Sequence, residues 1–437
     1  MKFKDFDLDP RLNEGIKRSG YDEPTPVQEK VIIPAMEGRD IIGSAQTGTG
    51  KTAAFVLPIL HRLLKEQRSY VSVLIVTPTR ELAEQINENI DILKSGTGIR
   101  SATIYGGVGA NPQIRALREG VDIIVACPGR LLDLINQGYV KLDKVETLVL
   151  DEADRMLDMG FLPDIKRIIT YLPVKRQTML FSATFAPEIE ALAKNVLHNP
   201  KRIALGLSGP AHTVSHALYP VPQHLKGALL LKVLEHTDTN SVLIFTRTKY
   251  RAKSLARKIE SNKYTVTSLH SNRTQGQRQA ALKGFKDGTY HIMVATDIAA
   301  RGLDVENISH VINFDMPGTA DDYIHRIGRT GRAERSGDAF TFITADDEDL
   351  IRKLEKIMGK RIPRKTMDDL DYNAPKPKHT APPRSPGRSP RRFGSPRPSG
   401  DRKPSGDRKS SGDRKSSGDR KPSGDRKSSA PKRHYRR

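Results

Sequence analysis

Two short stretches carry residue types at spacings that suit phosphate chemistry. The first is Ala45-Gln46-Thr47-Gly48-Thr49-Gly50-Lys51-Thr52, which lies between the apolar run 41–44 and an apolar stretch with helical spacing. A strand, a glycine-rich turn and a helix start are the context of a phosphate-binding loop, whose N–H groups surround the anion. We expect Lys51 to reach the β- and γ-phosphates and the Thr52 hydroxyl to hold Mg²⁺. A glycine turn before an ordinary helix would not explain this Lys-Thr pair.

The second stretch is Asp151-Glu152-Ala153-Asp154, which follows the apolar run 148–150. A buried strand would deliver these carboxylates to its C-terminal end, where open α/β sheets bind their ligands. We expect Asp151 to hold Mg²⁺ beside Thr52, and Glu152 to orient and deprotonate an attacking water. An acidic helix start after a strand is the ordinary alternative, but the phosphate loop upstream favours catalysis.

The elements that must position these groups alternate between short apolar strands and helical stretches. This alternation predicts an α/β fold with parallel sheets and helices on both faces. The expected strands are 41–44, 73–76, 102–105, 123–126, 148–150, 179–181 and 202–205, and after a break 242–245, 266–269, 292–295, 311–314 and 339–343. The second series contains no further phosphate loop, so the sequence predicts one nucleotide site for two similar domains.

Composition changes divide the chain into four parts. We expect a first domain over 1–207, a linker over 208–213, a second domain over 214–372 and a disordered tail over 373–437. The tail contains 21 Lys and Arg, 5 Asp and no Val, Ile, Leu or Met, so it cannot bury a core. Within it, Ser-Gly-Asp-Arg-Lys recurs five times with a six-residue period.

The net charge of +22 is concentrated in this tail, because residues 1–372 hold 52 basic and 46 acidic groups. A mildly basic body with a strongly basic tail indicates a polyanionic partner, most simply nucleic acid, and argues against a membrane because the tail has little to insert. Cys127 is the only cysteine, which excludes a disulfide within the chain and fits a reducing compartment. The first residues lack a signal-peptide core, so we expect a cytoplasmic location.

The order of these motifs resembles that of the DEAD-box RNA helicases over about residues 1–372, with Asp151–Asp154 as the signature itself. Among bacterial members, the spacing looks most like the RhlE-type group. The resemblance implies two tandem RecA-like domains and RNA-stimulated ATP hydrolysis. Other segments that resemble family motifs are 20–28, 78–83, 106–107, 182–184, 295–304 and 325–332.

The resemblance implies an adenine site and a catalytic pair of arginines. Gln28 offers a donor and an acceptor in one plane, which suits the edge of adenine, while Phe3 and Tyr21 belong to the same motif. The ordinary alternative, which we rank lower, is that Phe3 is a core residue and Gln28 a helix-start residue. Arg329 and Arg332 would stabilise the departing phosphoryl group when the domains close, and Asp304 would contact the ribose. Arg326 fits a solvated basic helix face.

The resemblance also implies that RNA is held by its backbone on the opposite rim of both domains. The expected RNA contacts are Arg80, Gly107, Arg130, Arg247, Gln275, Arg278 and Thr296. Asp154, Ser182, Thr184 and His325 match the motifs that couple RNA binding to hydrolysis. Cys127 replaces the usual threonine of its motif and is a poorer hydrogen-bond donor, which we expect to weaken one phosphate contact without loss of activity.

Two other classes of function remain open. A DNA-directed motor would share the nucleotide site, and an RNA clamp or annealing chaperone would use ATP only as a latch. The intact Asp151-Glu152 pair argues against an inactive enzyme. Ribosomal and RNA-decay complexes are the partners that the family suggests besides RNA.

Overall fold

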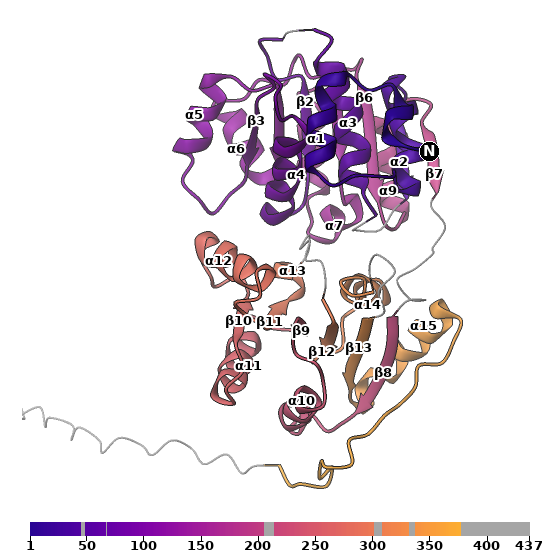
Figure 1. Ribbon diagram of the computed structural model, residues 1–437, viewed down its shortest axis with the longest axis vertical. Coiled ribbons are helices and arrows are strands. Elements are labelled where there is room, and N and C mark those ends of the chain that lie inside the picture. The colour runs from indigo at the N-terminus through magenta and orange to yellow at the C-terminus, as the bar shows by residue number, and fades with distance from the viewer. Residues whose placement is uncertain (45–48, 67, 205–213, 301–307, 332–336, 377–437) are drawn as a thin grey trace, which may run out of the picture. The chain divides into compact units, whose positions relative to one another are not determined.

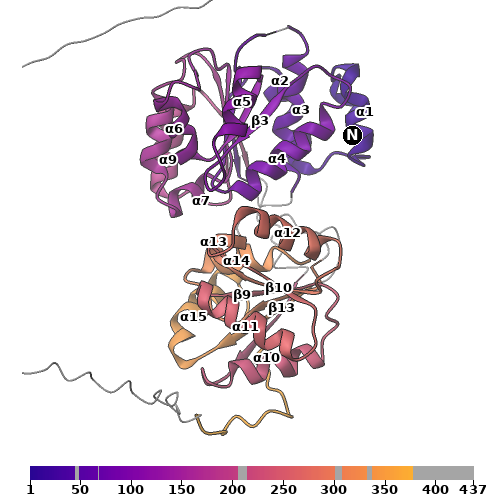
Figure 2. The same ribbon diagram turned by 90° about the vertical axis from the view of Figure 1, so that its left-hand side faces the viewer.

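The computed structural model describes residues 1–44, 49–66, 68–204, 214–300, 308–331 and 337–376. Residues Met1–Pro377 form one compact unit that contains two parallel β-sheets. Helices cover both faces of each sheet (Figures 1 and 2). The expected α/β fold with parallel sheets is therefore confirmed.

The first sheet has the strand order β3-β4-β2-β5-β6-β1-β7. Its strands are β1 (Ile41–Ser44), β2 (Val73–Val76), β3 (Ser101–Ile104), β4 (Ile123–Ala126), β5 (Thr147–Leu150), β6 (Gln177–Ser182) and β7 (Lys201–Ala204). Each adjacent pair is parallel, as in Ile41 opposite Met179, so all strands end at one edge of the sheet. The central strands are fully buried because helices cover both of their faces.

Two groups of helices cover the two faces of this sheet, and each buries its own apolar core. The N-terminal group is α1 (Asn13–Arg18), α2 (Pro26–Met36), α3 (Lys51–Leu63) and α4 (Arg80–Leu93). The other group is α5 (Asn111–Glu119), α6 (Pro128–Asn136), α7 (Ala153–Asp158), α8 (Leu162–Ile169) and α9 (Pro187–Val196). Pro58 lies inside α3 without ending the helix, because the packing of this helix outweighs the loss of one backbone hydrogen bond.

The second sheet has the order β10-β11-β9-β12-β13-β8. Its strands are β8 (Val214–Pro220), β9 (Val242–Thr246), β10 (Val266–Leu269), β11 (Ile292–Thr296), β12 (His310–Asn313) and β13 (Gly337–Ile343). Helices α10 (Lys226–Glu235) and α11 (Lys249–Ser261) bury one apolar core against it. The helices α12 (Gln275–Lys286), α13 (Asp297–Ala300), α14 (Ala320–Ile327) and α15 (Glu348–Met358) contribute to two other cores.

The segment that follows α15 packs back onto the second sheet. The Leu218 N–H of β8 donates to the Pro363 carbonyl at 2.8 Å, and the Lys365 N–H donates to the Leu218 carbonyl at 2.8 Å. Ile362 is buried, and Ala374 packs against the core under α10 while its carbonyl lies 2.8 Å from His224 Nε2. The described chain thus remains attached to the second sheet two residues beyond the limit of 372 that we expected.

Most expected strands differ from the observed ones by a residue or two at their ends, but β8 was not expected. Val214–Pro220 alternates between buried and exposed positions only at its start, and it follows directly on the stretch of linker composition. The residues predicted as linker, 208–213, lie outside the described part of the chain, as does the tail from residue 377. The four-part domain division and the disorder of the tail stay predictions.

Candidate nucleotide and RNA site

The described end of the phosphate loop is held by the motif around Gln28. Gly50 has φ of 88° and is the N-cap of α3. The Gln28 Nε2 group donates to the Gly50 carbonyl at 3.2 Å, and the Thr25 hydroxyl donates to the Thr49 carbonyl at 2.9 Å. Gln28 is 2% exposed and also accepts from the Thr25 N–H at 2.8 Å, as a capping residue of α2.

This geometry is compatible with both interpretations of Gln28, as a contact to adenine and as a helix-start residue. Its amide has two N–H donors and two acceptor lone pairs, and the two hydrogen bonds to Gly50 and Thr25 use one of each. One donor and one acceptor remain, which is what the adenine edge requires. A side chain on Gly50 would press on this amide, since its Cβ would lie 2.7 Å from Gln28 Nε2.

Phe3 and Tyr21 lie together beside this helix. Their rings stack with centroids 5.7 Å apart, and Phe6 meets Phe3 edge-on at 5.9 Å. Phe3 is only 6% exposed and belongs to the apolar core of the first sheet. Phe3 is therefore a core residue, as one of the two interpretations of the sequence proposed. Stacking of adenine on the remaining surface of Phe3 stays a prediction.

Lys51 and Asp151 face one another across the ends of the central strands. Lys51 Nζ lies 3.9 Å from Asp151 Oδ1, and both side chains are nearly buried. Burial raises the pKa of Asp151 to about 6, and the Glu152 charge adds to this while Lys51 opposes it. A carboxylate in this position gains from any further cation, because its ionised form lacks solvation.

The residues present fit a Mg²⁺ ion, although they would form only part of its shell. Thr52 is the second residue of α3, next to Lys51, so its hydroxyl and the Asp151 carboxylate would supply oxygen donors of the kind that Mg²⁺ prefers. Among the described residues, no group of three or more His, Cys, Asp or Glu side chains could hold a metal. Phosphate oxygens and water would have to complete the coordination, as is usual for Mg²⁺ at nucleotide sites.

Glu152 has an unusual backbone conformation at the start of α7. Its φ and ψ are 52° and 53°, in the left-handed region, although it is not a glycine. Its side chain is 6% exposed, and its N–H donates to Asp151 Oδ1 at 3.0 Å. Such a conformation costs about 1–3 kcal/mol and is found mostly at functional sites. The strained backbone at Glu152 therefore indicates that the placement of its carboxylate serves a function.

Asp154 connects the acidic motif to the end of β6. Its Oδ2 atom accepts from the Ala183 N–H at 3.1 Å and the Thr184 N–H at 3.0 Å, and its own N–H donates to Ser182 Oγ at 3.2 Å. The Ser182 hydroxyl donates to the Thr184 carbonyl at 2.6 Å. Because β6 lies between β5 and β1, this network lies between the acidic motif and the phosphate loop.

The expected RNA residues of the first domain follow the other strands of the first sheet, at the same edge as the nucleotide site. Arg80, Gly107 and Arg130 follow β2, β3 and β4, whereas the nucleotide residues follow β1, β5 and β6. Gly107 has φ of 81°, and a Cβ there would lie 2.0 Å from Arg80 Nη1. Arg130 donates to the Val108 carbonyl at 3.2 Å and keeps a buried Nη1 atom without a partner. The expected RNA residues therefore lie on the same edge of the sheet as the expected nucleotide residues, at the ends of the other strands.

The second sheet is divided in the same way. Arg247 follows β9, Thr296 ends β11, and Gln275 and Arg278 lie on α12 after β10, while His325 and Arg329 lie on and just after α14, which follows β12. Arg247 is exposed, and its N–H donates to Asp315 Oδ2 at 2.9 Å. Gln275 and Arg278 instead contact Glu81 of α4, at 3.2 Å and 3.0 Å, and Gln275 is only 4% exposed.

Arg329 is buried just after the end of α14, and His325, within the last turn of this helix, is half-buried. Burial lowers the pKa of His325 to about 3, and the charges of Arg155 and Arg329 add to this while Asp154 opposes it. The ring is therefore neutral near pH 7. Arg329 is 5% exposed. On the preceding turn, Asp322 pairs with Arg155 at 2.8 Å, which places α14 against the residue after the acidic motif.

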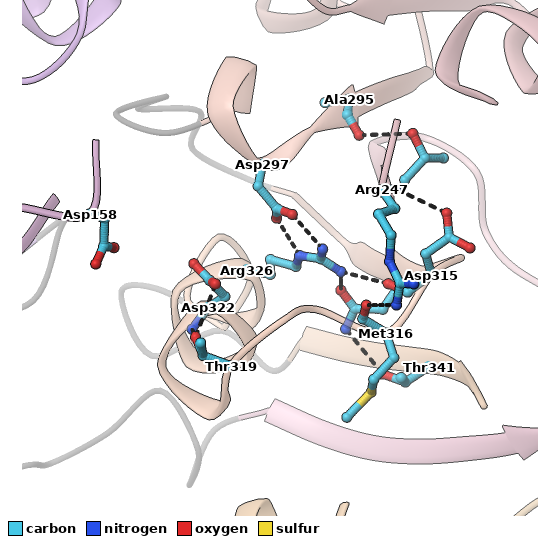
Figure 3. A network of polar contacts seen from close by, with 12 residues as sticks. Asp158, Arg247, Ala295, Asp297, Asp315, Met316, Thr319, Asp322, Arg326 and Thr341 are labelled. Carbon is cyan, nitrogen blue, oxygen red and sulfur yellow. Dashed lines mark hydrogen bonds and ion pairs between the residues drawn. The ribbon is translucent and has the colours of Figure 1, made fainter. Parts of the chain in front are cut away.

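Arg326 is the residue whose role the sequence did not reveal, and the expectation of a solvated helix face is wrong. It is 3% exposed, and its guanidinium binds both Asp297 oxygens, at 2.5 Å and 2.7 Å (Figure 3). It also donates to Asn313 Oδ1 at 2.9 Å and to the Asp315 carbonyl at 2.8 Å. No local pattern signals this role, because its partners Asp297 and Asn313 lie at the ends of two other strands.

Some expected site residues lie outside the described part of the chain. These are Ala45, Gln46, Thr47, Gly48, Asp304 and Arg332. Cys127 is described as the N-cap of α6, without a side-chain hydrogen bond to the cap, and burial raises the pKa of its thiol to about 12. It is therefore an unreactive thiol in this position.

Sequence profiles of two families match the chain. The DEAD/DEAH box helicase profile covers residues 25–192, and the helicase conserved C-terminal domain covers residues 225–334. These segments contain most strands of the two sheets, and with them Lys51, the acidic motif and Arg329. The chain belongs to the DEAD-box helicase family.

Named relatives and solved structures agree with this assignment. The chain is 41% identical over 362 residues to the ATP-dependent RNA helicase CshA of Listeria monocytogenes, covering 83% of this chain and 69% of that protein. It is 44% identical to the ATP-dependent rRNA helicase RRP3 of Kluyveromyces lactis, with coverages of 84% and 76%. Among solved structures, Saccharomyces cerevisiae Dbp5 bound to RNA and ADP BeF3 matches with a TM-score of 0.76 and 30% identity, covering 84% of this chain and 96% of that one.

Proposed function

We propose that this protein is an ATP-dependent RNA helicase that closes its two sheet domains on single-stranded RNA and thereby separates short duplexes or remodels RNA–protein complexes. The family, the relatives named as RNA helicases and the Dbp5 structure with RNA support this function. The observation that carries it is the Asp154 network, which connects the acidic motif to Ser182 and Thr184 beside the phosphate loop.

Within the nucleotide site, each residue has a distinct role in hydrolysis. Lys51 neutralises the β- and γ-phosphates, and Glu152 orients the attacking water and takes its proton. Arg329, together with Arg332, stabilises charge on the departing phosphoryl group. Thr52 and Asp151 would hold Mg²⁺, which would offset the negative charge of the phosphates. The Asp151 pKa of about 6 supports this, because a cation restores the stability of the buried carboxylate.

Closure of the two domains is the step that links RNA to hydrolysis. Arg155 and Asp322 pair between the helices that follow β5 and β12, and Glu81 contacts Gln275 and Arg278. RNA would be held through its backbone by Arg80, Gly107, Arg130, Arg247 and Thr296, and the two contacts to Glu81 would stabilise the closed form. Such contacts position the chain and do not read its sequence.

The physiological setting is a further part of the proposal. The RhlE-type subgroup is a prediction from spacing, and the relatives named above are CshA and RRP3 proteins. The name of RRP3 makes ribosomal RNA the substrate to test first, ahead of RNA-decay complexes. No helix in the described ranges is long and apolar enough to cross a membrane, and the cytoplasmic location stays a prediction from composition.

Replacing Glu152 with glutamine tests the proposed reaction. The variant keeps the shape and hydrogen bonding of the side chain but removes the base, so we expect ATP and RNA binding to persist while turnover falls by at least about 10²-fold. Glu190→Gln is the matched control, because it alters an exposed carboxylate paired with Arg202 in the same domain. Normal RNA-stimulated hydrolysis in Glu152→Gln would contradict the assignment of the base.

The two other classes of function need separate measurements. Matched RNA and DNA strands of one sequence, compared for ATPase stimulation, distinguish an RNA helicase from a DNA-directed motor. Strand annealing without ATP would reveal a chaperone activity, which could coexist with unwinding. Equal stimulation by both nucleic acids would contradict the proposed RNA preference.

A further inference from the structure

The charge of the described domains is concentrated in one stretch of the second sheet. Residues 241–286 contain eleven lysines and arginines and one acidic residue, Glu260, for a net charge of +10. Since residues 1–372 carry a net charge of +6, the remainder of that region is slightly acidic. This asymmetry is separate from the basic tail and lies within a folded domain.

These residues fold into a continuous surface around the edge strand of the sheet. Strand β10 is the last in the order, with α11 packed on one face and α12 on the other (Figures 1 and 2). Arg247, a proposed RNA contact, lies two residues before the start of α11. The surface is therefore continuous with the proposed RNA path.

The outward side of α11 carries the most regular part of this surface. Lys249, Lys253 and Arg257 follow one another at intervals of four residues, so they share one side of the helix. Lys253 and Arg257 are exposed, and neither has an ion pair with any described residue. We call this set the α11 basic face.

Tyr250 adds an aromatic ring to the α11 basic face. It is 72% exposed, which is unusual for a side chain of this size, and Lys249 Nζ lies 5.4 Å from its ring centroid. A positive track with an exposed aromatic ring is the combination that binds single-stranded nucleic acid, through phosphate contacts and base stacking. A solvated helix face would need neither the ring nor this excess of basic over acidic residues.

We propose that the α11 basic face is a second RNA-binding surface, which holds the single-stranded RNA that flanks the segment gripped between the domains. This inference rests on the RNA helicase function proposed above. The surface would lengthen the RNA footprint and favour substrates with a single-stranded extension. It would act on affinity and not on the chemistry of the nucleotide site.

The test is a pair of double variants in the full chain. Lys253→Ala with Arg257→Ala removes two charges from the α11 basic face, and Arg352→Ala with Lys356→Ala removes two exposed charges at the same spacing from α15. Binding is measured by fluorescence anisotropy over a range of salt concentrations, with single-stranded RNAs of about 25 and about 8 nucleotides.

We expect the α11 variant to reduce the salt slope for the longer RNA by about 1.4, because two phosphate contacts are lost. That corresponds to roughly 25-fold weaker binding near 0.1 M salt. Binding of the shorter RNA, and the ATPase activity that it stimulates, should stay unchanged, which separates this inference from the proposed function. The α15 variant should bind both RNAs normally.

The aromatic contribution has its own pair of variants. Tyr250→Ala should weaken binding of the longer RNA several-fold, whereas Tyr250→Phe should keep it because the ring still stacks. Equal effects of the α11 and α15 double variants would overturn the inference. An equal loss with short and long RNA would also overturn it, since the residues would then belong to the central path.

Discussion

Replacing Arg326 with alanine removes a buried guanidinium that four hydrogen bonds hold in place. Two of these go to the oxygens of Asp297, directly after β11, and two go to Asn313 Oδ1 at the end of β12 and to the Asp315 carbonyl just beyond it. The ring of Phe245, in β9, lies 5.0 Å from the same group. One side chain of α14 therefore joins the ends of three neighbouring strands.

The cost of this substitution follows from what remains behind. Breaking a buried ion pair by removing one partner costs about 3–5 kcal/mol, and each lost hydrogen bond to a neutral acceptor costs about 1 kcal/mol. Asp297 is 27% exposed, so water can solvate part of its abandoned charge. We therefore expect about 4 kcal/mol of destabilisation in the second sheet, which corresponds to a lower Tm by roughly 10 °C.

The control is a pair of the same geometry on the surface. Arg202 binds both oxygens of Glu190, at 2.9 Å and 2.7 Å, but the two side chains are 55% and 31% exposed. Exposed pairs contribute about 0–1 kcal/mol, so Arg202→Ala should be nearly neutral. Arg326→Lys keeps the charge without the planar fork and should lose about half as much stability as Arg326→Ala.

Guanidinium denaturation followed by circular dichroism measures the difference. Hydrogen exchange of the amides in β9, β11 and β12 assigns it to the second sheet, since these strands should lose protection while β2 and β5 keep theirs. A change of less than about 1 kcal/mol in Arg326→Ala, equal to that in Arg202→Ala, would refute the reasoning from burial.

Three further predictions concern the nucleotide site and the tail. Gly50→Ala forces a side chain into a left-handed conformation and against Gln28, so the KM for ATP should rise at least about 10-fold, as measured by steady-state hydrolysis; an unchanged KM would contradict the packing described. Burial lowers the pKa of His325 to about 3, so protonation favours the unfolded state and the free energy of unfolding falls as the pH drops from about 6.5 toward 3. Between pH 7 and pH 5, the free energy of unfolding of His325→Gln, measured by urea denaturation, should fall by about 2 kcal/mol less than that of the wild type. Parallel pH curves for the two proteins would exclude this role of His325. The basic tail should hold RNA through phosphate contacts, so removing residues 377–437 should weaken RNA binding and reduce its salt dependence while the maximal ATPase rate is kept. An unchanged affinity would contradict this role of the tail.

Much of the fold was predictable because parallel strands buried on both faces are continuous apolar runs. Ile41–Ser44, Val73–Val76 and Ile123–Ala126 coincide with the expected ranges. β8 was missed because it begins where the linker composition ends and because part of its pairing is with residues 363–365, far along the chain. No local pattern carries that information.

The site was predictable where chemistry depends on residues close in sequence, and less so where it depends on strand order. The contact between Lys51 and Asp151 follows from two recognisable motifs. The division of each sheet edge into a proposed nucleotide half and a proposed RNA half requires the order of strands, which the sequence does not display. Arg326 was misjudged for a related reason, since its partners come from two other strands.

The strand-like pairing of residues 363–365 with Leu218 determines where this protein can be shortened. Without that segment, β8 would present unpaired N–H and C=O groups to solvent, and such an exposed edge promotes association between molecules. A truncation that stops after α15 should therefore aggregate at high concentration, whereas one that retains the chain through Lys376 should stay monodisperse in light scattering. The basic tail could then be exchanged or removed without touching the packing of the domain that carries it.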